Sequence, residues 1–342
     1  MRAVVFTAAG GPEVISIREV PTPVPGPGEI RVRIRAAGLN RADIYQRRGG
    51  YAAPPGWPAD IPGLEYAGDV DALGPGVTSW RPGDRVMGLV GGGGQAEAVV
   101  VRAEEVLPLP PNLSYVEGAA IPEVFYTAYD ALVNRGRVAA GERVLIHAVG
   151  SGVGTAAAQI AKYLGATVIG TSRSAGKLAR AAAYGVDVGI DTSRTAFGSA
   201  VGVPVHVVLD VLGASALADN LSVLAVRGRL VMLGLMAGRR TDMDLEPVLH
   251  KRLEIIGSVL RTRGPEERAA LTAEFRERML PLFEARGGQP WLRPVVERTY
   301  PMEQLAEAHG VMERNENFGK LVGEWAGRSE GDRSALKGLR PD

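Results

Sequence analysis

A glycine-rich turn carries the clearest chemical signal in the chain. The stretch RVLIHAVGSGVGTAAAQIAKYLG runs from an apolar segment through a cluster of glycines into an alanine-rich segment. Glycines let the backbone turn tightly and approach a pyrophosphate, which the amide groups at the start of the next helix can bind. The strict G-x-G-x-x-G spacing is not kept, and a close-packed turn without a ligand is the alternative. The order of strand, turn, helix and strand favours dinucleotide binding, with contacts from Gly150, Ser151, Gly152 and Val153.

The next apolar strand indicates which dinucleotide is bound. An NAD enzyme usually places Asp or Glu about 20 residues after the turn, where the carboxylate binds the ribose hydroxyls. Residues 166–186 contain no acidic residue and offer Ser172, Arg173 and Lys177 instead. Hydroxyl and cationic groups suit the 2′-phosphate of NADP. A solvated helix start would explain either cation alone, but their position after this strand predicts NADPH as the cofactor.

Residues that ligate transition metals are scarce. The chain has no cysteine, which excludes disulfides, thiolate zinc sites, iron–sulfur clusters and cysteine nucleophiles. The four histidines have no pair with metal-ligand spacing. Two of them, His147 and His206, lie in apolar segments that are typical of core strands. No metal site is predicted.

The charge balance limits the partners. The 342 residues include 39 basic and 38 acidic ones, so no bulk field attracts nucleic acid or anionic lipid. No apolar run approaches the roughly 20 residues of a membrane span, and the first residues lack the long apolar segment of a signal peptide. We therefore expect a globular cytoplasmic protein without a nucleic-acid or membrane partner.

The elements that must position these residues fall into two regions. Up to about residue 110, short strands are separated by turns such as PGPG and RPGD, which indicates a largely antiparallel β domain. An S-x-x-E capping box at Ser114 and Glu117 marks the change. Apolar strands then begin near residues 143, 167, 186, 205, 229 and 254, with helical stretches between most of them. This alternation predicts an α/β fold whose parallel sheet is doubly wound in the Rossmann manner.

These regions define a predicted domain organisation. Residues 1–122 form the first part of a β-rich catalytic domain, and residues 123–264 form an inserted Rossmann domain that binds NADPH. Residues 265–326 return to the catalytic domain through a long helical pattern that starts at Pro265, then a strand, a helix and a last strand. Residues 327–342 are polar and aperiodic, so we expect a mobile tail.

Several segments together resemble a known family. They are LNRADIYQRRGGY (39–51), GGGGQAE (91–97), AAIPEVFYTAYDAL (119–132), LIHAVGSGVGTAA (145–157) and NFGKLV (317–322). In this order they are similar to the zinc-independent NADPH:quinone oxidoreductases related to zeta-crystallin, within the medium-chain dehydrogenase/reductase superfamily. They are most similar to the branch of the tumour-suppressor-inducible quinone oxidoreductases. The resemblance covers about residues 1–325 and implies a GroES-like fold for the β-rich domain.

The same comparison separates the chain from zinc-dependent members of the superfamily. Those carry a cysteine before the first catalytic helix and a histidine in G-H-E, where this chain has Asn40 and reads Gly63-Leu64-Glu65. A leucine cannot ligate zinc, so alcohol oxidation with a Lewis acid is not expected. A quinone or activated alkene accepts hydride without a metal, because its own carbonyl groups delocalise the charge.

The resemblance also implies site residues. It places Asn40, Asp43, Tyr45 and Tyr51 beside the nicotinamide and the quinone. Either tyrosine could donate a proton or hydrogen bond to the developing hydroquinone oxygen, although water could protonate a hydroquinone anion as well. The alternatives are that Tyr51 covers a loop and that Asp43 caps a helix or pairs with a nearby arginine.

Further cofactor contacts are implied with the same status. Thr127 would contact the carboxamide end of the nicotinamide. Family members often place a tyrosine where this chain has Asp191-Thr192, so Thr192 replaces a stacking ring. The remaining implied contacts follow the fifth and sixth strands of the parallel sheet or precede the last strand of the chain; they are Gly234, Leu235, Met236, Leu260, Arg261 and Asn317.

The sequence thus predicts an NADPH-dependent reductase of a small-molecule quinone, acting by hydride or single-electron transfer. One alternative is an NADPH-dependent reductase of alkenals or enones. Another is an NADPH-binding protein with a structural or RNA-associated role like those of zeta-crystallins. The resemblance also implies a homodimer, formed through the edge strand near residues 254–259.

Overall fold

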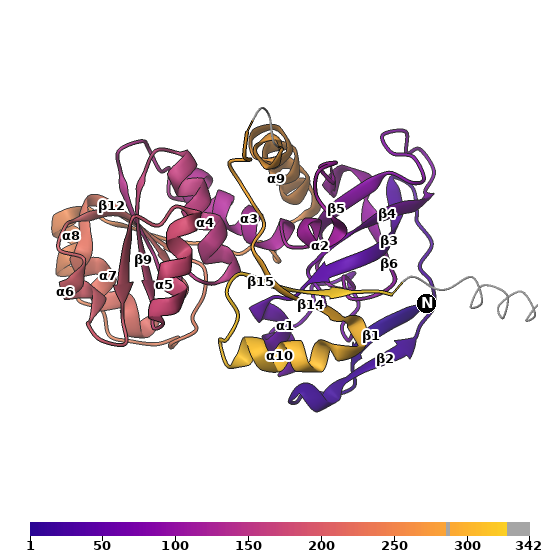
Figure 1. Ribbon diagram of the computed structural model, residues 1–342, viewed down its shortest axis with the longest axis horizontal. Helices are drawn as coiled ribbons and strands as arrows, with labels where there is room; N and C mark the ends of the chain where they lie inside the picture. Colours follow the sequence, from indigo (N-terminus) through magenta and orange to yellow (C-terminus); the bar gives the residue numbers. More distant parts are fainter. Residues whose placement is uncertain (285–287, 327–342) are drawn as a thin grey trace, which may run out of the picture.

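The computed structural model describes residues 1–284 and 288–326, and the chain forms two lobes (Figure 1). One lobe contains a parallel sheet with the strand order β10-β9-β8-β11-β12-β13. Counted along the chain, this order is third, second, first, fourth, fifth and sixth, the doubly wound order of dinucleotide-binding domains. Its strands are β8 (Arg143–Ile146), β9 (Thr167–Ser172), β10 (Val188–Asp191), β11 (Val205–Asp210), β12 (Leu224–Met232) and β13 (Glu254–Gly257).

Helices cover both faces of this sheet because its strands are apolar on both faces. Val144 and Ile146 of β8 pack in the cluster that contains helix α4, whereas Leu145 packs on the opposite side with helices α6 and α7. Buried strands of this kind are typical of parallel sheets. The helices of this lobe are α4 (Gly152–Tyr163), α5 (Ala175–Ala181), α6 (Phe197–Ala200), α7 (Leu217–Val223) and α8 (Glu246–Lys251).

The other lobe is built on a mostly antiparallel sheet with the order β14-β15-β3-β4-β5-β7, and β6 pairs with β3. Its strands are β3 (Glu29–Gly38), β4 (Glu65–Leu73), β5 (Arg85–Leu89), β6 (Ala98–Arg102), β7 (Val106–Pro108), β14 (Val296–Pro301) and β15 (Lys320–Glu324). A separate hairpin pairs β1 (Arg2–Phe6) with β2 (Ile15–Glu19). The end of the chain therefore returns to the sheet that its beginning forms, which confirms the expected insertion of a Rossmann sheet into a β-rich domain.

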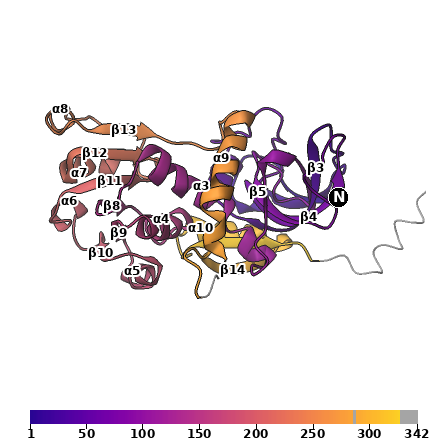
Figure 2. The ribbon, with the colours of Figure 1, turned by 90° about the horizontal axis from the view of Figure 1, so that it is seen from above.

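Helices α3 and α9 join the two lobes. Figures 1 and 2 both show α9 (Pro265–Arg278) between the sheets, where it packs on α3 (Pro122–Tyr129). The Tyr126 ring of α3 stacks on Phe275 of α9 with centroids 4.4 Å apart. These rings belong to one apolar core that includes residues of both sheets. The remaining helices are α1 (Arg41–Arg47), α2 (Tyr115–Gly118) and α10 (Leu305–Glu313).

Two boundaries differ from the sequence prediction. The helical pattern that starts at Pro265 continues in sequence to residue 285, but α9 ends at Arg278 and a 3₁₀ turn follows over Leu280–Phe283. Pro281 has no amide hydrogen to donate and therefore cannot continue an α-helix. Strand β12 begins at Leu224 rather than near residue 229. The domain boundaries at 122/123 and 264/265 stay predictions, and the predicted tail at 327–342 lies outside the described residues.

A buried ion pair fixes the segment that leaves the parallel sheet. Arg263 lies after β13, and its Nη2 is 2.6 Å from Oδ2 of Asp130, which begins a π-helical extension of α3. Both side chains are buried, with exposed fractions of 6% and 1%. The Ser258 hydroxyl donates to the same carboxylate at 2.7 Å. Burial by itself would raise the pKa of Asp130, but these partners hold it below its usual value.

We predict that Arg263→Met lowers the free energy of unfolding by about 3–5 kcal/mol, because the buried Asp130 then loses its close cation and keeps only Arg135 at 3.4 Å. The stability that the lowered pKa supplies is present above about pH 3.9, the usual Asp value, and is lost as pH falls through the native pKa. Wild type and variant should therefore converge in acid. Denaturant unfolding followed by tryptophan fluorescence measures both effects. The exposed Arg33→Met is the control, with a loss of less than about 1 kcal/mol. Equal losses in the two variants would contradict the prediction.

Candidate active site

The glycine turn joins β8 to α4 in a form that suits a phosphate group. Ser151 caps the helix, and its hydroxyl accepts a hydrogen bond from the Gly154 amide at 3.0 Å. A Cβ on Gly154 would lie 2.6 Å from the carbonyl oxygen of Ala148, so a side chain there would collide with the turn. The amides of Gly152 and Val153 precede the first bonds of the helical ladder and are free to bind an anion.

A group of cations lies beside the end of β9, the neighbouring strand. Lys177 Nζ donates to the backbone oxygen of Asn315 at 2.5 Å, and Arg41 Nη2 donates to the side-chain oxygen of Asn315 at 2.7 Å. Arg173 is exposed. Burial lowers the pKa of Lys177; the charge of Glu297 opposes this shift, and the charges of Arg180, Arg41 and Arg173 add to it. The oxygens that Lys177 and Arg41 bind here are neutral, so this group favours an added anion.

Thr192 and Asn317 lie at the same edge of the sheet as the glycine turn. The Thr192 amide donates to the Ser172 oxygen at 2.9 Å, which places it next to the end of β9. The Asn317 amide group donates to Gly319 at 2.8 Å, and Gly319 in turn donates to the Gly150 oxygen at 2.9 Å. Both predicted contacts therefore lie close to the turn.

The segment after β12 reaches that edge too. Gly234 is half-buried, whereas Leu235 and Met236 are 44% and 43% exposed. Strands β8 and β11 are neighbours at the centre of the sheet, where the strand order reverses. Open α/β sheets bind their ligands at this position, outside the carboxyl ends of the strands. The predicted dinucleotide contacts of this lobe thus gather around one end of one sheet.

Opposite this edge, three polar side chains form a buried network. Lys320 Nζ lies 2.5 Å from Glu65 Oε1, and it donates to Asn40 Oδ1 at 2.7 Å and to the Leu39 oxygen at 2.6 Å. The Asn40 amide group donates to Glu65 Oε1 at 2.9 Å. The three side chains are 8% exposed or less. A Cβ on Gly152 would lie 2.8 Å from Lys320 Cδ, so this network borders the glycine turn.

Asp43 lies under the site and does not line the cavity. Its carboxylate accepts from the Asn40 amide at 2.8 Å and from the Gly63 amide at 3.3 Å, which ties the start of α1 to the loop before β4. Burial raises its pKa to about 6, although these amides and Lys320 oppose the shift. The Gln95 side-chain amide also donates to this carboxylate, at 3.5 Å, so its partners are structural groups and a catalytic role for Asp43 stays a prediction.

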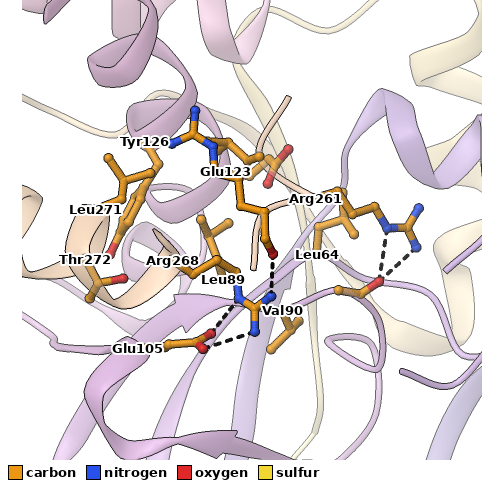
Figure 3. Close-up of a pocket in the computed structure, with 13 residues that line it drawn as sticks. Leu64, Leu89, Val90, Glu105, Glu123, Tyr126, Arg261, Arg268, Leu271 and Thr272 are labelled. Atoms are coloured by element: carbon orange, nitrogen blue, oxygen red, sulfur yellow. Dashed lines mark hydrogen bonds and ion pairs between the residues drawn. The ribbon is translucent and has the colours of Figure 1, made fainter. Parts of the chain in front are cut away.

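A cavity opens between the two lobes next to this network. Its volume is about 30 Å³, and that of the neighbouring hollow is about 490 Å³. A second hollow adjoins it, because Arg261, Arg263 and Arg268 line both. Figure 3 shows Glu123, Tyr126 and Arg261 in its wall. The other residues that line the first cavity are mainly apolar; they include Leu64, Leu89, Val90, Leu260 and Leu271.

Arg261 lines both the cavity and the second hollow, and Tyr51 lines the second hollow. The Arg261 guanidinium lies over the Tyr51 ring, 4.6 Å from its centroid, and donates to the oxygens of Gly91 and Tyr51. It also donates to the Gln46 side chain at 2.8 Å. Arg261 therefore connects the segment after β13 with the loops of the β-rich lobe, in addition to the cofactor contact predicted for it. Tyr45 is 37% exposed on α1.

The aromatic and proline residues of the 51–57 loop shape the second hollow. Pro54, Pro55 and Trp57 line it. A Cβ on Gly91 would lie 2.5 Å from the Trp57 ring, so a side chain at this position would displace the ring. Thr127 is half-buried on α3, one turn after Glu123. The cavity thus has one flat apolar side and one side with polar groups.

The residues at the cavity do not suit a catalytic zinc ion. Leu64 occupies its wall with an apolar side chain, and the Lys320 ammonium already binds Glu65. Within residues 1–284 and 288–326, no three His, Cys, Asp or Glu side chains are grouped so that they could hold a metal ion. Over the same residues, no helix has the length and apolar character needed to cross a membrane.

Four residues of this region were not among the predicted site residues. Glu123 and Lys320 lie inside the segments AAIPEVFYTAYDAL and NFGKLV, and Glu65 follows Leu64. The sequence therefore contains the motifs of these three residues but does not indicate that their side chains lie close together. Arg41 also stands in such a segment, yet its approach to Lys177 depends on Asn315 at the far end of the chain. Sequence spacing carried no signal for these contacts.

Comparisons with known proteins agree with this geometry. The family model of the alcohol dehydrogenase GroES-like domain matches residues 26–111, and the model described as zinc-binding dehydrogenase matches residues 152–284. A quinone oxidoreductase of Lama guanicoe is 32% identical over 321 residues, which cover 90% of this chain and 92% of that protein.

Solved structures show the same relationship. The crystal structure of an NAD-dependent alcohol dehydrogenase has a TM-score of 0.83 and 34% identity, covering 95% of this chain and 100% of that chain. A mycobacterial protein complexed with NADPH has a TM-score of 0.82 and 29% identity, with the same coverage. These findings confirm the family that the sequence motifs resemble. The chain belongs to the medium-chain dehydrogenase/reductase superfamily of nicotinamide-dependent oxidoreductases, in the family of the quinone oxidoreductases.

Proposed function

We propose that the chain reduces small-molecule quinones with NADPH, by hydride or single-electron transfer and without zinc. One observation carries this proposal: a largely apolar cavity is lined by Leu64 and Glu123, whose neighbour Glu65 binds the buried Lys320, and Lys320 in turn borders the glycine turn. An acceptor whose own carbonyl groups delocalise charge needs no Lewis acid, so a site with an ammonium in this position suits it. The name of the Lama guanicoe relative supports the same acceptor class.

The preference for NADPH rests on the cations beside β9. Arg173, Lys177 and Arg41 would bind the 2′-phosphate, because Lys177 and Arg41 now bind neutral oxygens and no acidic residue stands in residues 166–186. The amides of Gly152 and Val153, together with the cap at Ser151, would hold the pyrophosphate. The bound cofactor supplies a hydride equivalent from its nicotinamide.

The residues of the β-rich lobe orient the acceptor and exclude water. Arg261 keeps the Tyr51 loop and Gly91 together over the cavity, and Pro54, Pro55 and Trp57 provide a flat apolar surface for a ring. Burial raises the pKa of Tyr51 above its usual value, so its hydroxyl stays protonated and can donate a hydrogen bond to an acceptor oxygen. Asn40 is held by Glu65 and Lys320 at the bottom of the site.

The edge strand β13 supports the proposal of a homodimer. Figure 2 shows it at the rim of the parallel sheet, and its Ile255 side chain is 40% exposed. An unpaired strand edge with an apolar side chain is a template for pairing with a second strand. A second copy of this chain would satisfy both its backbone groups and its apolar surface.

The first test is turnover. NADPH and NADH are each offered with a benzoquinone, a fused-ring quinone and a trans-2-alkenal, with EDTA present and absent. We expect quinone reduction that prefers NADPH and does not change with EDTA, because no step uses a metal. Turnover of the alkenal without the quinones would instead assign the chain to the enone reductases. NADPH binding without reduction of any acceptor would refute the proposed catalysis.

Removal of one cation tests the choice of cofactor. Lys177→Met should raise the Kd of NADPH by about 10- to 100-fold, the effect of one charge-assisted hydrogen bond, and leave the Kd of NADH almost unchanged. Fluorescence titration measures both constants. Lys162→Met is the matched control, because Lys162 lies in the last turn of α4 and pairs with Asp187. A similar loss of affinity for both cofactors in Lys177→Met would argue against a 2′-phosphate site.

Sedimentation tests the dimer. The wild type should sediment at twice 36.1 kDa, and Ile255→Lys should sediment near 36.1 kDa, because a charge on an edge strand prevents pairing. Val188→Lys is the control: Val188 is 48% exposed on β10, the opposite edge of the same sheet. A monomeric wild type, or dissociation by both variants alike, would be inconsistent with a β13 interface.

A further inference from the structure

Glu123 is placed in the cavity by its own backbone. It is the second residue of α3, after Pro122, and its amide donates to Glu65 Oε2 at 2.8 Å. Its side chain lines the same cavity as Leu64 and Arg261 (Figure 3). Among the described residues, none forms a hydrogen bond or ion pair with its carboxyl group. Neither cofactor binding nor the orientation of the acceptor uses this carboxyl group.

The cations near Glu123 are bound to other groups. Lys320 from β15 uses its ammonium on Glu65, Asn40 and the Leu39 oxygen. Arg261, after β13, donates to Gly91, Tyr51 and Gln46. Each lowers the pKa of Glu123 only by its charge at a distance. Neither one holds the carboxyl group in its ionised form.

The neighbouring acids favour the protonated form. The charges of Glu65 from β4 and Asp43 from α1 both act on Glu123, and Tyr51 is close enough for Glu123 to raise its pKa. Burial, followed by the charge of Glu65, raises the pKa of Glu123 to about 8, against the opposing effect of Lys320 and Arg261. At neutral pH this side chain is therefore mostly a carboxylic acid, which has a proton to donate.

We propose that Glu123 is a catalytic acid that donates the proton required by the reduced acceptor. This inference rests on the proposed function. It follows from a carboxyl group that lines the acceptor cavity, has no partner among the described side chains and is fixed by the bond from its amide to Glu65. It assigns to Glu123 the role that the sequence motifs suggested for a tyrosine.

The proton transfer conserves atoms and electrons. Reduction by hydride adds two electrons and one proton to the quinone and leaves an oxyanion on it, while the nicotinamide is oxidised. The O–H bond of Glu123 breaks, its electron pair stays on the carboxylate, and a new O–H bond forms on the hydroquinone. Arg261 and Lys320 stabilise the carboxylate that this step creates. Solvent returns a proton to Glu123 after the product leaves.

The first test needs neither cofactor nor turnover. Infrared difference spectra are recorded over a titration from about pH 6 to about pH 10, across the range in which Glu123 should ionise. The wild type should lose a carbonyl band of a protonated carboxyl group near pH 8, and Glu123→Gln should lack this band. A wild type without such a band would overturn the proposal, because Glu123 would then be ionised at neutral pH.

The second test compares two classes of acceptor. Glu123→Gln keeps the shape of the side chain but cannot transfer a proton, so kcat with a quinone should fall by about 100-fold or more. Ferricyanide takes up single electrons and no proton, so its reduction should fall by less than about 3-fold in the same variant. The wild-type kcat with quinone should decline above about pH 8, and this decline should be absent from the variant.

Controls separate this inference from the proposed function. Glu277→Gln removes an exposed carboxylate of α9 and should match the wild type in every assay. An unchanged Kd for NADPH and an unchanged circular dichroism spectrum show that Glu123→Gln folds. Equal losses with quinone and ferricyanide, or full quinone turnover in Glu123→Gln, would refute Glu123 as the acid while leaving quinone reduction established. A wild type that reduces no acceptor would instead refute the proposed function.

Discussion

The ammonium group of Lys320 is the interaction on which the site depends. It lies in β15, 3% exposed, and binds oxygens from the end of β3, from the start of α1 and from β4. A buried ammonium is costly unless its hydrogen bonds are made, and here Leu39, Asn40 and Glu65 accept all three. The last strand of the chain is thereby fixed to the first part of the β-rich lobe. The methylene groups of the Lys320 side chain also lie against Gly152, the first residue of helix α4.

The carboxylates around this ammonium differ in their surroundings, and the difference separates their roles. Glu65 has a direct cation, whereas Asp43 is held by backbone amides. Glu123 borders the cavity and has neither. Glu65 next to Glu123 makes a second negative charge unfavourable, so burial and repulsion act in the same direction on Glu123. Glu65 thus has a structural role, whereas its neighbour Glu123 stays protonated and faces the cavity.

The arginines at the boundary between the lobes also differ in their partners and in their roles. Arg263 and Arg268 pair with Asp130 and Glu105, and these pairs anchor the segment that leads from β13 to α9. Arg261 binds neutral oxygens of both α1 and the loops above the cavity. Because the paired arginines fix the chain that directly follows Arg261, the stem of Arg261 is held in place. Its guanidinium can then stack on Tyr51 beside the second hollow.

The sequence by itself determined the local structure and the family. Apolar periodicity and the glycine turn sufficed for the doubly wound sheet, since strand alternation and the close packing at Gly154 depend on neighbours in the chain. Only the tertiary structure decided which charges meet. Lys320 reaches Glu65 across 255 positions, and Arg41 reaches Lys177 through Asn315, because the final strand returns to the first sheet. Burial and electrostatic repulsion act through space, so the protonated state of Glu123 depends on these contacts rather than on its motif.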